Sequence, residues 1–159
     1  MYIQYAEYTQ LYGPMEETTF NLLAIEASRF MENHTTGIDG VKKLNRFFPE
    51  IESDLLAVTH CAGHLIHTMD QIRQAEQAHS YEVTEQGLRG RIVSSLSAGN
   101  ESISYSTGGI TTEIDAAVKD RHSRNRLLYG IVRDCLRGAS DRNGVNLLYM
   151  GPYPRRYLV

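Results

Sequence analysis

Three histidines and a cysteine stand close together in the middle of the chain, within a segment whose apolar residues repeat at helical spacing. They are His60, Cys61, His64 and His67. At about 100° per residue the histidines fall within a ~60° sector of a helix, a spacing that lets imidazoles reach one metal ion. The sector lies opposite the apolar stripe, so we expect these side chains to face away from the chain's own core. We favour a polar helix face, solvated or lodged in a subunit interface, and expect no metal or other cofactor.

The other reactive residue types lack the patterns that catalysis requires. Cys61 and Cys135 are the two cysteines, and each lies on or near an apolar helix face, where a thiol usually behaves as a small inert hydrophobe. There is no Gly-x-Ser-x-Gly and no phosphate-binding Gly-x-x-x-x-Gly-Lys. Neighbouring acids such as Glu16 and Glu17 suit the positive end of a helix better than acid–base chemistry. The sequence therefore predicts no enzymatic activity.

The net charge of −3 hides a strong asymmetry along the chain. Residues 1–88 carry 13 acids and 5 bases, a net of −8, whereas residues 89–159 carry 6 acids and 11 bases, a net of +5. Of the 16 basic residues 13 are arginine, whose planar guanidinium suits paired contacts with carboxylates. A chain with an acidic N-terminal part and an arginine-rich C-terminal part could bind copies of itself, another protein or a polyanion.

A basic stretch near the end of the chain is the candidate for either nucleic-acid or subunit contact. Its members are Lys119, Arg121, Arg124, Arg126, Arg133, Arg137 and Arg142. Such residues can touch a phosphate backbone without reading base sequence. No helix-turn-helix or zinc-finger spacing accompanies them, and an isoelectric point of about 6.1 does not suit an autonomous DNA-binding domain. We therefore expect an arginine face that meets the acidic half of a neighbouring copy, through Arg121, Arg124, Arg126, Arg133 and Arg137.

Apolar periodicity predicts four main helices. The first covers residues 3–12, ended by Gly13-Pro14, and the second covers 15–34. A connector over 37–49 leads to a third helix of about seven turns that begins after Pro49. The fourth begins near Thr112, and its apolar side is interrupted from Asp120 to Arg126. The buried stripe of the second helix is Phe20, Leu23, Ala24, Ala27, Phe30 and Met31, and that of the third includes Ile51, Leu55, Val58, Ala62, Leu65, Ile66, Met69 and Ile72.

Two segments break the helical pattern. Residues of about 90–108 have strand-like composition, with Ile103 and Tyr105 alternating with serine, which predicts a short β-hairpin or extended loop. Residues 139–159 have no helical period, and we expect this extended tail to have little to bury against in a monomer and to order against a partner. The predicted fold is mainly α, a small bundle of about four helices over residues 1–138, followed by a partner-binding tail over 139–159.

The apolar runs and the first residues of the chain suggest where it is made. No run of about 18 apolar residues is present, so we expect no membrane-spanning helix and no membrane partner. The first residues lack the basic region and apolar stretch of a signal peptide. Cytoplasmic synthesis fits best.

Several motifs, in their order and spacing, resemble the head–tail connector, or adaptor, family of long-tailed bacteriophages. The points of similarity span nearly the whole chain. They are Tyr5-x-x-Tyr8-x-x-x-Tyr12-Gly13, Phe20-x-x-Leu23-x-x-x-Ala27-Ser28-x-x-Met31, Thr35-Thr36-Gly37, Pro49-Glu50-Ile51, Val93-Ser94-Ser95 with Ser102-Ile103-Ser104-Tyr105, and Gly144-Val145-x-Leu147-Leu148-Tyr149-x-Gly151. The last is the most specific. Two features depart from the family pattern: a more basic fourth helix at 122–126 and a tail that extends through 152–159.

The resemblance implies a structural protein of the virion neck, assembled in the host cytoplasm. Such subunits form a ring, twelve-fold where it matches a portal, that docks on the portal protein and extends the channel through which genomic DNA passes without sequence recognition. The ring also presents a platform for the next neck, stopper or tail-completion protein. On this basis the residues expected to contact the portal are Leu147, Leu148, Tyr149, Met150, Gly151, Tyr153, Arg155, Arg156 and Tyr157. Those expected to contact neighbours or the next neck component are Ile92, Val93, Ile103 and Tyr105.

Two functions of other classes stay open at the level of sequence. One is a metal-binding helical enzyme that uses His60, His64 and His67. The other is a small nucleic-acid-binding regulator that uses the basic stretch. For a connector, we predict that the acidic half or the histidine face lines the channel, since strong positive charge there would bind phosphates and retard DNA.

Overall fold

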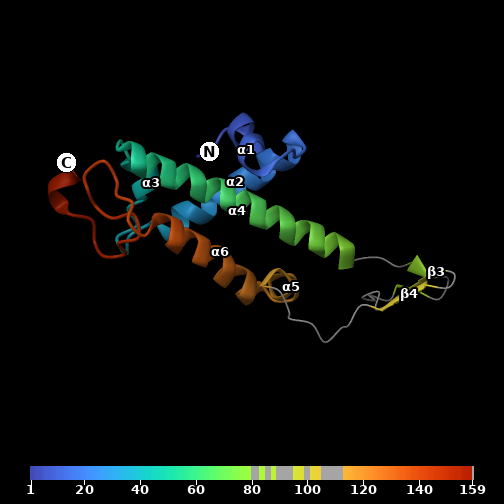
Figure 1. Ribbon diagram of the computed structural model, residues 1–159. Helices are drawn as coiled ribbons and strands as arrows, with labels where there is room; N and C mark the ends of the chain where they lie inside the picture. Colours follow the sequence, from blue (N-terminus) through green and yellow to red (C-terminus); the bar gives the residue numbers. More distant parts are fainter. Residues whose placement is uncertain (80–82, 85–86, 89–94, 99–100, 105–112, 159) are drawn as a thin grey trace. The chain divides into compact units, whose positions relative to one another are not determined.

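The protein is mainly helical, as the sequence predicts. Figure 1 shows the computed structural model, which describes residues 1–79, 83–84, 87–88, 95–98, 101–104 and 113–158, with side chains described for 1–77 and 113–158. The α-helices in that part of the chain are α1 (Tyr5–Tyr12), α2 (Glu17–His34), α3 (Lys43–Arg46), α4 (Glu52–His79), α5 (Glu113–Lys119) and α6 (Arg121–Leu136). A 3-10 turn, η1 (Arg155–Tyr157), lies near the C-terminus.

The chain divides into two compact units. The first comprises residues 1–70 and 126–159, and the second comprises residues 71–125. Both α4 and α6 contribute residues to each unit. The first unit contains the hydrophobic core and most of the candidate functional residues.

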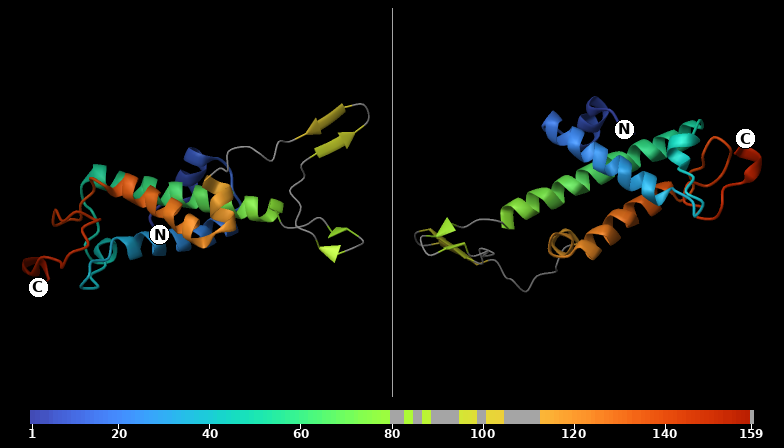
Figure 2. Two further views of the ribbon diagram at one scale, coloured as in Figure 1. Left: turned by 90° about the horizontal axis from the view of Figure 1, so that it is seen from below. Right: turned by 180° about the vertical axis from the view of Figure 1, so that it is seen from behind.

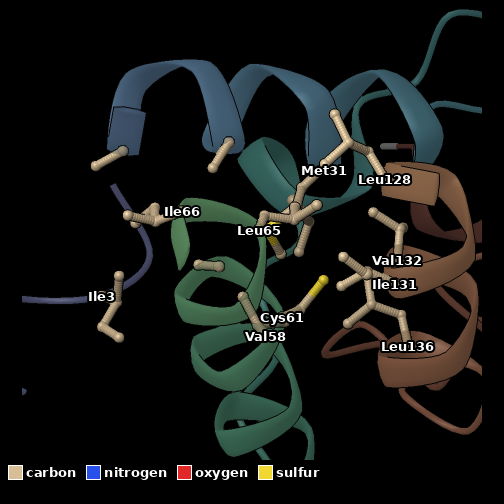
Figure 3. Packing of buried hydrophobic residues seen from close by; sticks show 14 of the residues in the cluster. Ile3, Met31, Val58, Cys61, Leu65, Ile66, Leu128, Ile131, Val132 and Leu136 are labelled. Atoms are coloured by element: carbon tan, nitrogen blue, oxygen red, sulfur yellow. The ribbon is translucent and has the colours of Figure 1, made fainter. Parts of the chain in front are cut away.

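The core of the first unit forms where α2 crosses the first half of α4 and the second half of α6 runs antiparallel to α4 (Figure 2). The stripe predicted for α2 is confirmed, with Phe30 partly buried and its other members buried. From α4 come Val58, Cys61, Ala62, Leu65 and Ile66, and from α6 come Leu128, Ile131, Val132 and Leu136 (Figure 3). Ile51 is a correction to the predicted stripe of α4: it precedes the helix and is 61% exposed.

Aromatic side chains attach the N-terminal helix α1 to this core. Tyr8 is buried, and its ring centroid lies 5.3 Å from that of Phe20 on α2. The hydroxyl of Tyr5 donates a hydrogen bond to the backbone oxygen of Met15 over 2.6 Å. On α4, Gly63 allows α1 to approach closely, because a Cβ there would lie 2.7 Å from the ring of Tyr12. The repeated tyrosines of the N-terminus therefore pack α1 against the core.

The C-terminal segment folds back on the same core, so the expectation that it has little to bury against is wrong. Leu147 is fully buried in the core cluster, and its backbone N–H donates to the oxygen of Ala139 over 2.9 Å. The intervening turn is closed by Asp141 N–H to Val145 O, also 2.9 Å, and Gly144 adopts φ +76°, which glycine tolerates without strain. Burial of one leucine thus anchors a segment with no helical period.

In the second unit, the predicted fourth helix is two helices, α5 and α6, separated at Asp120. The carboxylate of Asp120 accepts hydrogen bonds from the backbone N–H of Ser123 (2.7 Å) and from its hydroxyl (2.8 Å). This is the geometry of an N-terminal cap, in which a side chain satisfies one of the free N–H groups of a starting helix. The cap that Asp120 forms with Ser123 explains why a new helix begins at Arg121. The Asp-x-x-Ser spacing that makes this cap possible can be recognised in the sequence.

Acidification is expected to weaken the start of α6. The hydrogen bond from the Ser123 backbone N–H, followed by that from its hydroxyl, lowers the pKa of Asp120 below its usual range. The cap therefore stabilises the helix fully above the ordinary aspartate pKa, and its contribution is lost as the pH falls through the lower folded-state pKa. Amide hydrogen exchange at Ser123 and Arg124 should accelerate at low pH relative to exchange within the body of α6. An Asp120→Asn protein that showed the same pH dependence would contradict this role.

Four short strands, of which the backbone pairing is described, lie between α4 and α5. Strand β1 (Val83–Thr84) pairs antiparallel with β2 (Gly87–Leu88), and β3 (Ser95–Ala98) pairs antiparallel with β4 (Glu101–Ser104). In the second pair Leu96 is opposite Ile103. The rest of the region expected to form a hairpin, about 90–108, lies outside the described residues.

Candidate functional site

A polar and aromatic network holds the C-terminal segment against the connector that follows α2. The rings of Tyr153 and Phe47 stack, with centroids 4.6 Å apart and planes 10° from parallel. The hydroxyl of Tyr153 donates to Asp141 Oδ2 over 2.5 Å and accepts from Asn143 Nδ2 over 2.9 Å. Burial, and then the hydrogen bond to Asp141, raises the pKa of Tyr153 to about 12. The tyrosine is therefore a neutral donor to a buried carboxylate at physiological pH.

The connector side of this network contacts the tail through both backbone and side chain. Asp39 Oδ2 accepts the Tyr153 backbone N–H over 2.6 Å, which lowers the pKa of the Asp39 carboxyl. The backbone N–H of Ile38 donates to Met150 O over 2.9 Å. A Cβ on Gly37 would lie 2.9 Å from Gly151 O, so the backbones of the connector and the tail approach closely here.

Lys43 is the central charge of the network and is buried, with 1% of its surface exposed. Its ammonium group donates a hydrogen bond to the backbone oxygen of Tyr149. Burial lowers the pKa of Lys43, and the carboxylates of Asp141 and Asp39 oppose that shift. A buried ammonium between two carboxylates is stable only while its partners stay in place, so Lys43 couples α3 to the tail.

These contacts change the set of residues available to a partner. Leu147 and Tyr153, expected to contact the portal, are buried in their own chain, which is a correction to the sequence-based interface. Leu148, Gly151 and Tyr157 are partly buried. The members of the predicted set that are exposed are Tyr149, Met150, Arg155 and Arg156. A partner would therefore meet the outer surface of a folded tail.

Removing the Tyr153 hydroxyl tests the strength of this network. Tyr153→Phe leaves Asp141 Oδ2 without its tyrosine donor, and a hydrogen bond to a charged group contributes about 2 kcal/mol. We expect the free energy of unfolding in urea to fall by that amount. Tyr157→Phe is the matched control, since the Tyr157 ring only meets Tyr153 edge-on at 6.3 Å. Equal stability of the two variants would contradict the role of the Tyr153 hydroxyl.

The histidines of α4 are not gathered into a ligand set. His60 and His64 are exposed. His67 is partly buried, with its ring 5.1 Å from that of Tyr12, so the expectation that it faces away from the chain's own core is wrong. Among residues 1–77 and 113–158, no three His, Cys, Asp or Glu side chains lie close enough together to hold a metal ion.

The arginines of α6 divide into exposed residues and one with an internal partner. Arg121, Arg126 and Arg133 are exposed, and so is Arg137, which directly follows the last residue of α6. Arg124 is partly buried in the second unit, where its guanidinium pairs with Glu76 and also donates to Ala117 O over 3.2 Å. It therefore has a partner within its own chain, and its role at a subunit interface stays a prediction. Arg133 forms an exposed pair with Asp134 over 3.1 Å, which is weak in water and leaves it able to change partner.

The outer face of α2 exposes both acidic and apolar side chains. Glu17 and Glu26 are exposed on it, and between them Leu22 is 67% exposed and Ile25 is 47% exposed. Arg29, one turn after Ile25, is also exposed on this helix, so charges of both signs border the apolar pair. An exposed apolar pair with a charged rim is typical of a surface that meets another protein. Sequence reasoning missed this face, although the two apolar residues fall outside the buried stripe of α2.

The remaining candidate contacts lie in the segment between α4 and α5. Ile92, Val93 and Tyr105 lie outside the described residues. Ile103 lies on β4, opposite Leu96 of β3, and only its backbone pairing is described.

Of the helices that the structure describes, none has the length and apolar character needed to cross a membrane. No protein-family model, curated protein or solved structure matches this chain. Its function is therefore inferred from its own residues.

Proposed function

We propose that this protein is a structural head–tail connector subunit of a bacteriophage, which assembles into a ring on the portal. The observation that carries the proposal is the presence, on one folded unit, of two exposed faces of opposite charge. One is the outer face of α2, where the exposed acids Glu17 and Glu26 outnumber Arg29. The other is the arginine face of α6 and the adjoining Arg137, where the arginines outnumber the exposed Asp134. The family resemblance of the sequence supplies the biological setting.

Opposite charges on two different faces suit head-to-tail association. In a heterologous interface one face of a subunit meets another face of its neighbour, and a rotation that closes produces a ring. Glu17 and Glu26 of one copy would meet Arg126, Arg133 and Arg137 of the next, and the exposed Leu22 and Ile25 would supply the apolar centre of the contact. Charge complementarity of this kind fixes register and excludes wrong partners.

The folded tail supplies a second surface, for the portal. Met150, Arg155 and Arg156 are exposed on a segment that Leu147, Lys43 and Asp141 hold in place. Arginine and methionine are enriched at protein interfaces, and a segment that is already ordered loses less entropy on binding than a flexible one. We assign portal contact to this outer surface of the tail.

The channel surface follows from the remaining exposed groups. DNA must pass without being held, so the lining should carry no strong positive charge. If the arginines of α6 are used between subunits, the polar face of α4 with His60 and His64 is available for the lumen. The ring is expected to have twelve copies where it meets a twelve-fold portal, and to present its far side to a neck or stopper protein.

Portal binding by the tail is tested with surface substitutions rather than truncation, because truncation at Gly144 would also remove Leu147 from the core. The purified chain is mixed with the portal ring of the same virus and separated by size-exclusion chromatography. We expect co-elution of the wild-type chain, and loss of it when Met150→Glu and Arg155→Glu are combined. His60→Glu with Lys119→Glu, at exposed positions outside the tail, is the control. Failure of the wild-type chain to co-elute would contradict the assignment.

A further inference from the structure

Two thiols and an imidazole that lie far apart in the sequence meet between α4 and α6. Cys61 is fully buried on α4, and Figure 3 shows its sulfur pointing toward α6, on the side of Val132 and Leu136. On α6, Cys135 is partly exposed. Cys135 packs against the core cluster that contains Cys61, and both Cys61 and His64, one turn after Cys61, act on the Cys135 thiol. Cys61 and Cys135 are the two cysteines of the chain, and both are reduced.

The surroundings give the two sulfurs opposite character. The hydrogen bond from Cys61, and after it the hydrogen bond from His64, lowers the pKa of Cys135, although burial and the Asp134 carboxylate oppose the shift. The hydrogen bond with Cys135, together with burial, raises the pKa of Cys61. The thiolate is the nucleophile in thiol chemistry, and Cys135 is also the member of the pair that solvent reaches. Solvent thus reaches Cys135, whereas Cys61 is enclosed in the core.

We propose that Cys135 is a site of oxidative modification by peroxides, with Cys61 as the thiol that resolves it into an intramolecular disulfide between α4 and α6. In the first step the Cys135 thiolate attacks one oxygen of hydrogen peroxide. The O–O bond breaks, hydroxide leaves, and the sulfur becomes a sulfenic acid, oxidised by two electrons while the peroxide is reduced. In the second step the Cys61 sulfur attacks the sulfenic sulfur, the S–O bond breaks, and the departing hydroxide takes the Cys61 proton to form water.

The position of the pair in the chain gives the disulfide a structural consequence. Residues 71–125, the whole second unit, lie between Cys61 and Cys135 in sequence. A disulfide there would tie together the two chain segments that leave and re-enter the first unit. Closing so long a loop restricts the unfolded chain strongly, so the oxidised protein should unfold at a higher temperature than the reduced one. This thiol chemistry does not depend on the connector proposal.

Intact-protein mass spectrometry after limited exposure to hydrogen peroxide tests the chemistry. We expect the wild-type chain to lose two hydrogen atoms, peptide mapping to join Cys61 to Cys135, and dithiothreitol to reverse the change. Cys61→Ala should instead gain one oxygen at Cys135, which dimedone traps, and Cys135→Ala should resist modification. Oxygen gain without disulfide in the wild-type chain, or disulfides between chains, would overturn the proposal. Mapping of the wild-type chain decides the question even if a variant folds poorly.

The rate of iodoacetamide alkylation against pH tests the role of His64. We expect the midpoint for Cys135 to lie below the ordinary thiol value of about 8.5. His64→Gln should move it upward, by roughly one pH unit, because the imidazole no longer favours the thiolate. His60→Gln, one turn earlier and exposed, is the matched control and should leave the midpoint unchanged. An identical midpoint in His64→Gln and wild type would remove His64 from the site.

Discussion

Replacing Lys43 by alanine is expected to lower the free energy of unfolding by about 2–3 kcal/mol, the usual effect of removing a buried hydrogen bond made by a charged group. The Lys43 ammonium is buried and donates to the backbone oxygen of Tyr149, between the carboxylates of Asp141 and Asp39. Its loss removes a positive charge close to the Asp141 carboxylate, which then keeps its neutral donors, Tyr153, Asn143 and Val145. It also removes the link between α3 and the tail. The tail should then open, and trypsin should cut at Arg142 before the helices unfold.

Urea denaturation and limited proteolysis of three variants measure this effect. Lys42→Ala is the matched control, since Lys42 is the exposed neighbour, and its substitution should change stability by less than about 0.5 kcal/mol. Lys43→Met keeps most of the side-chain volume and removes the charge, so it separates packing from electrostatics. A Lys43→Ala protein as stable as Lys42→Ala, with an equally resistant tail, would contradict the account of the network.

Reversing the charge of the α6 face is expected to abolish ring formation under the proposed function. Arg126, Arg133 and Arg137 replaced together by glutamate would face the acids of α2 in the neighbouring copy. Like charges brought together at an interface cost several kcal/mol, so even about 3 kcal/mol weakens each contact on the order of 100-fold. Sedimentation velocity should show monomers where the wild-type chain forms rings.

Two further proteins make this test specific. A control with Lys42, Arg46 and Lys119 replaced by glutamate has the same change in net charge on other surfaces, and it should still form rings. Combining the α6 reversal with Glu17→Arg and Glu26→Arg on α2 should restore them, because the charges are then exchanged between faces. Circular dichroism confirms that each variant is folded. Rings from the α6 reversal alone would show that α2 and α6 do not form the subunit contact.

The helices of the first unit were accessible from sequence because each buries one stripe. Burial of Phe20, Leu23 and Ala27 follows from 3.6-residue spacing alone, and the observed bounds of α2 lie within two residues of those predicted. The apolar side of the predicted fourth helix is interrupted from Asp120 to Arg126, but this interruption was not interpreted as a break between two helices. The signal that could have shown it is the Asp120-x-x-Ser123 cap.

The tail and the thiol pair were not accessible in the same way, because their partners are distant in sequence. Lys43 and the Tyr149 oxygen are separated by 106 residues, and no local pattern joins them. Cys61 and Cys135 each read as an inert residue on an apolar face, and only the packing of α4 against α6 makes them neighbours. Periodicity predicts whether a single residue is buried or exposed. Which residues contact each other across the core can be known only from the fold.

Electron microscopy of the purified chain, alone and mixed with the portal ring of the same virus, tests whether the protein is a ring-forming connector. We expect closed rings of one subunit type, coaxial with the portal in the mixture, with the tails toward the portal and α2 of each subunit against α6 of the next. A chain that stays monomeric both alone and with the portal would contradict it.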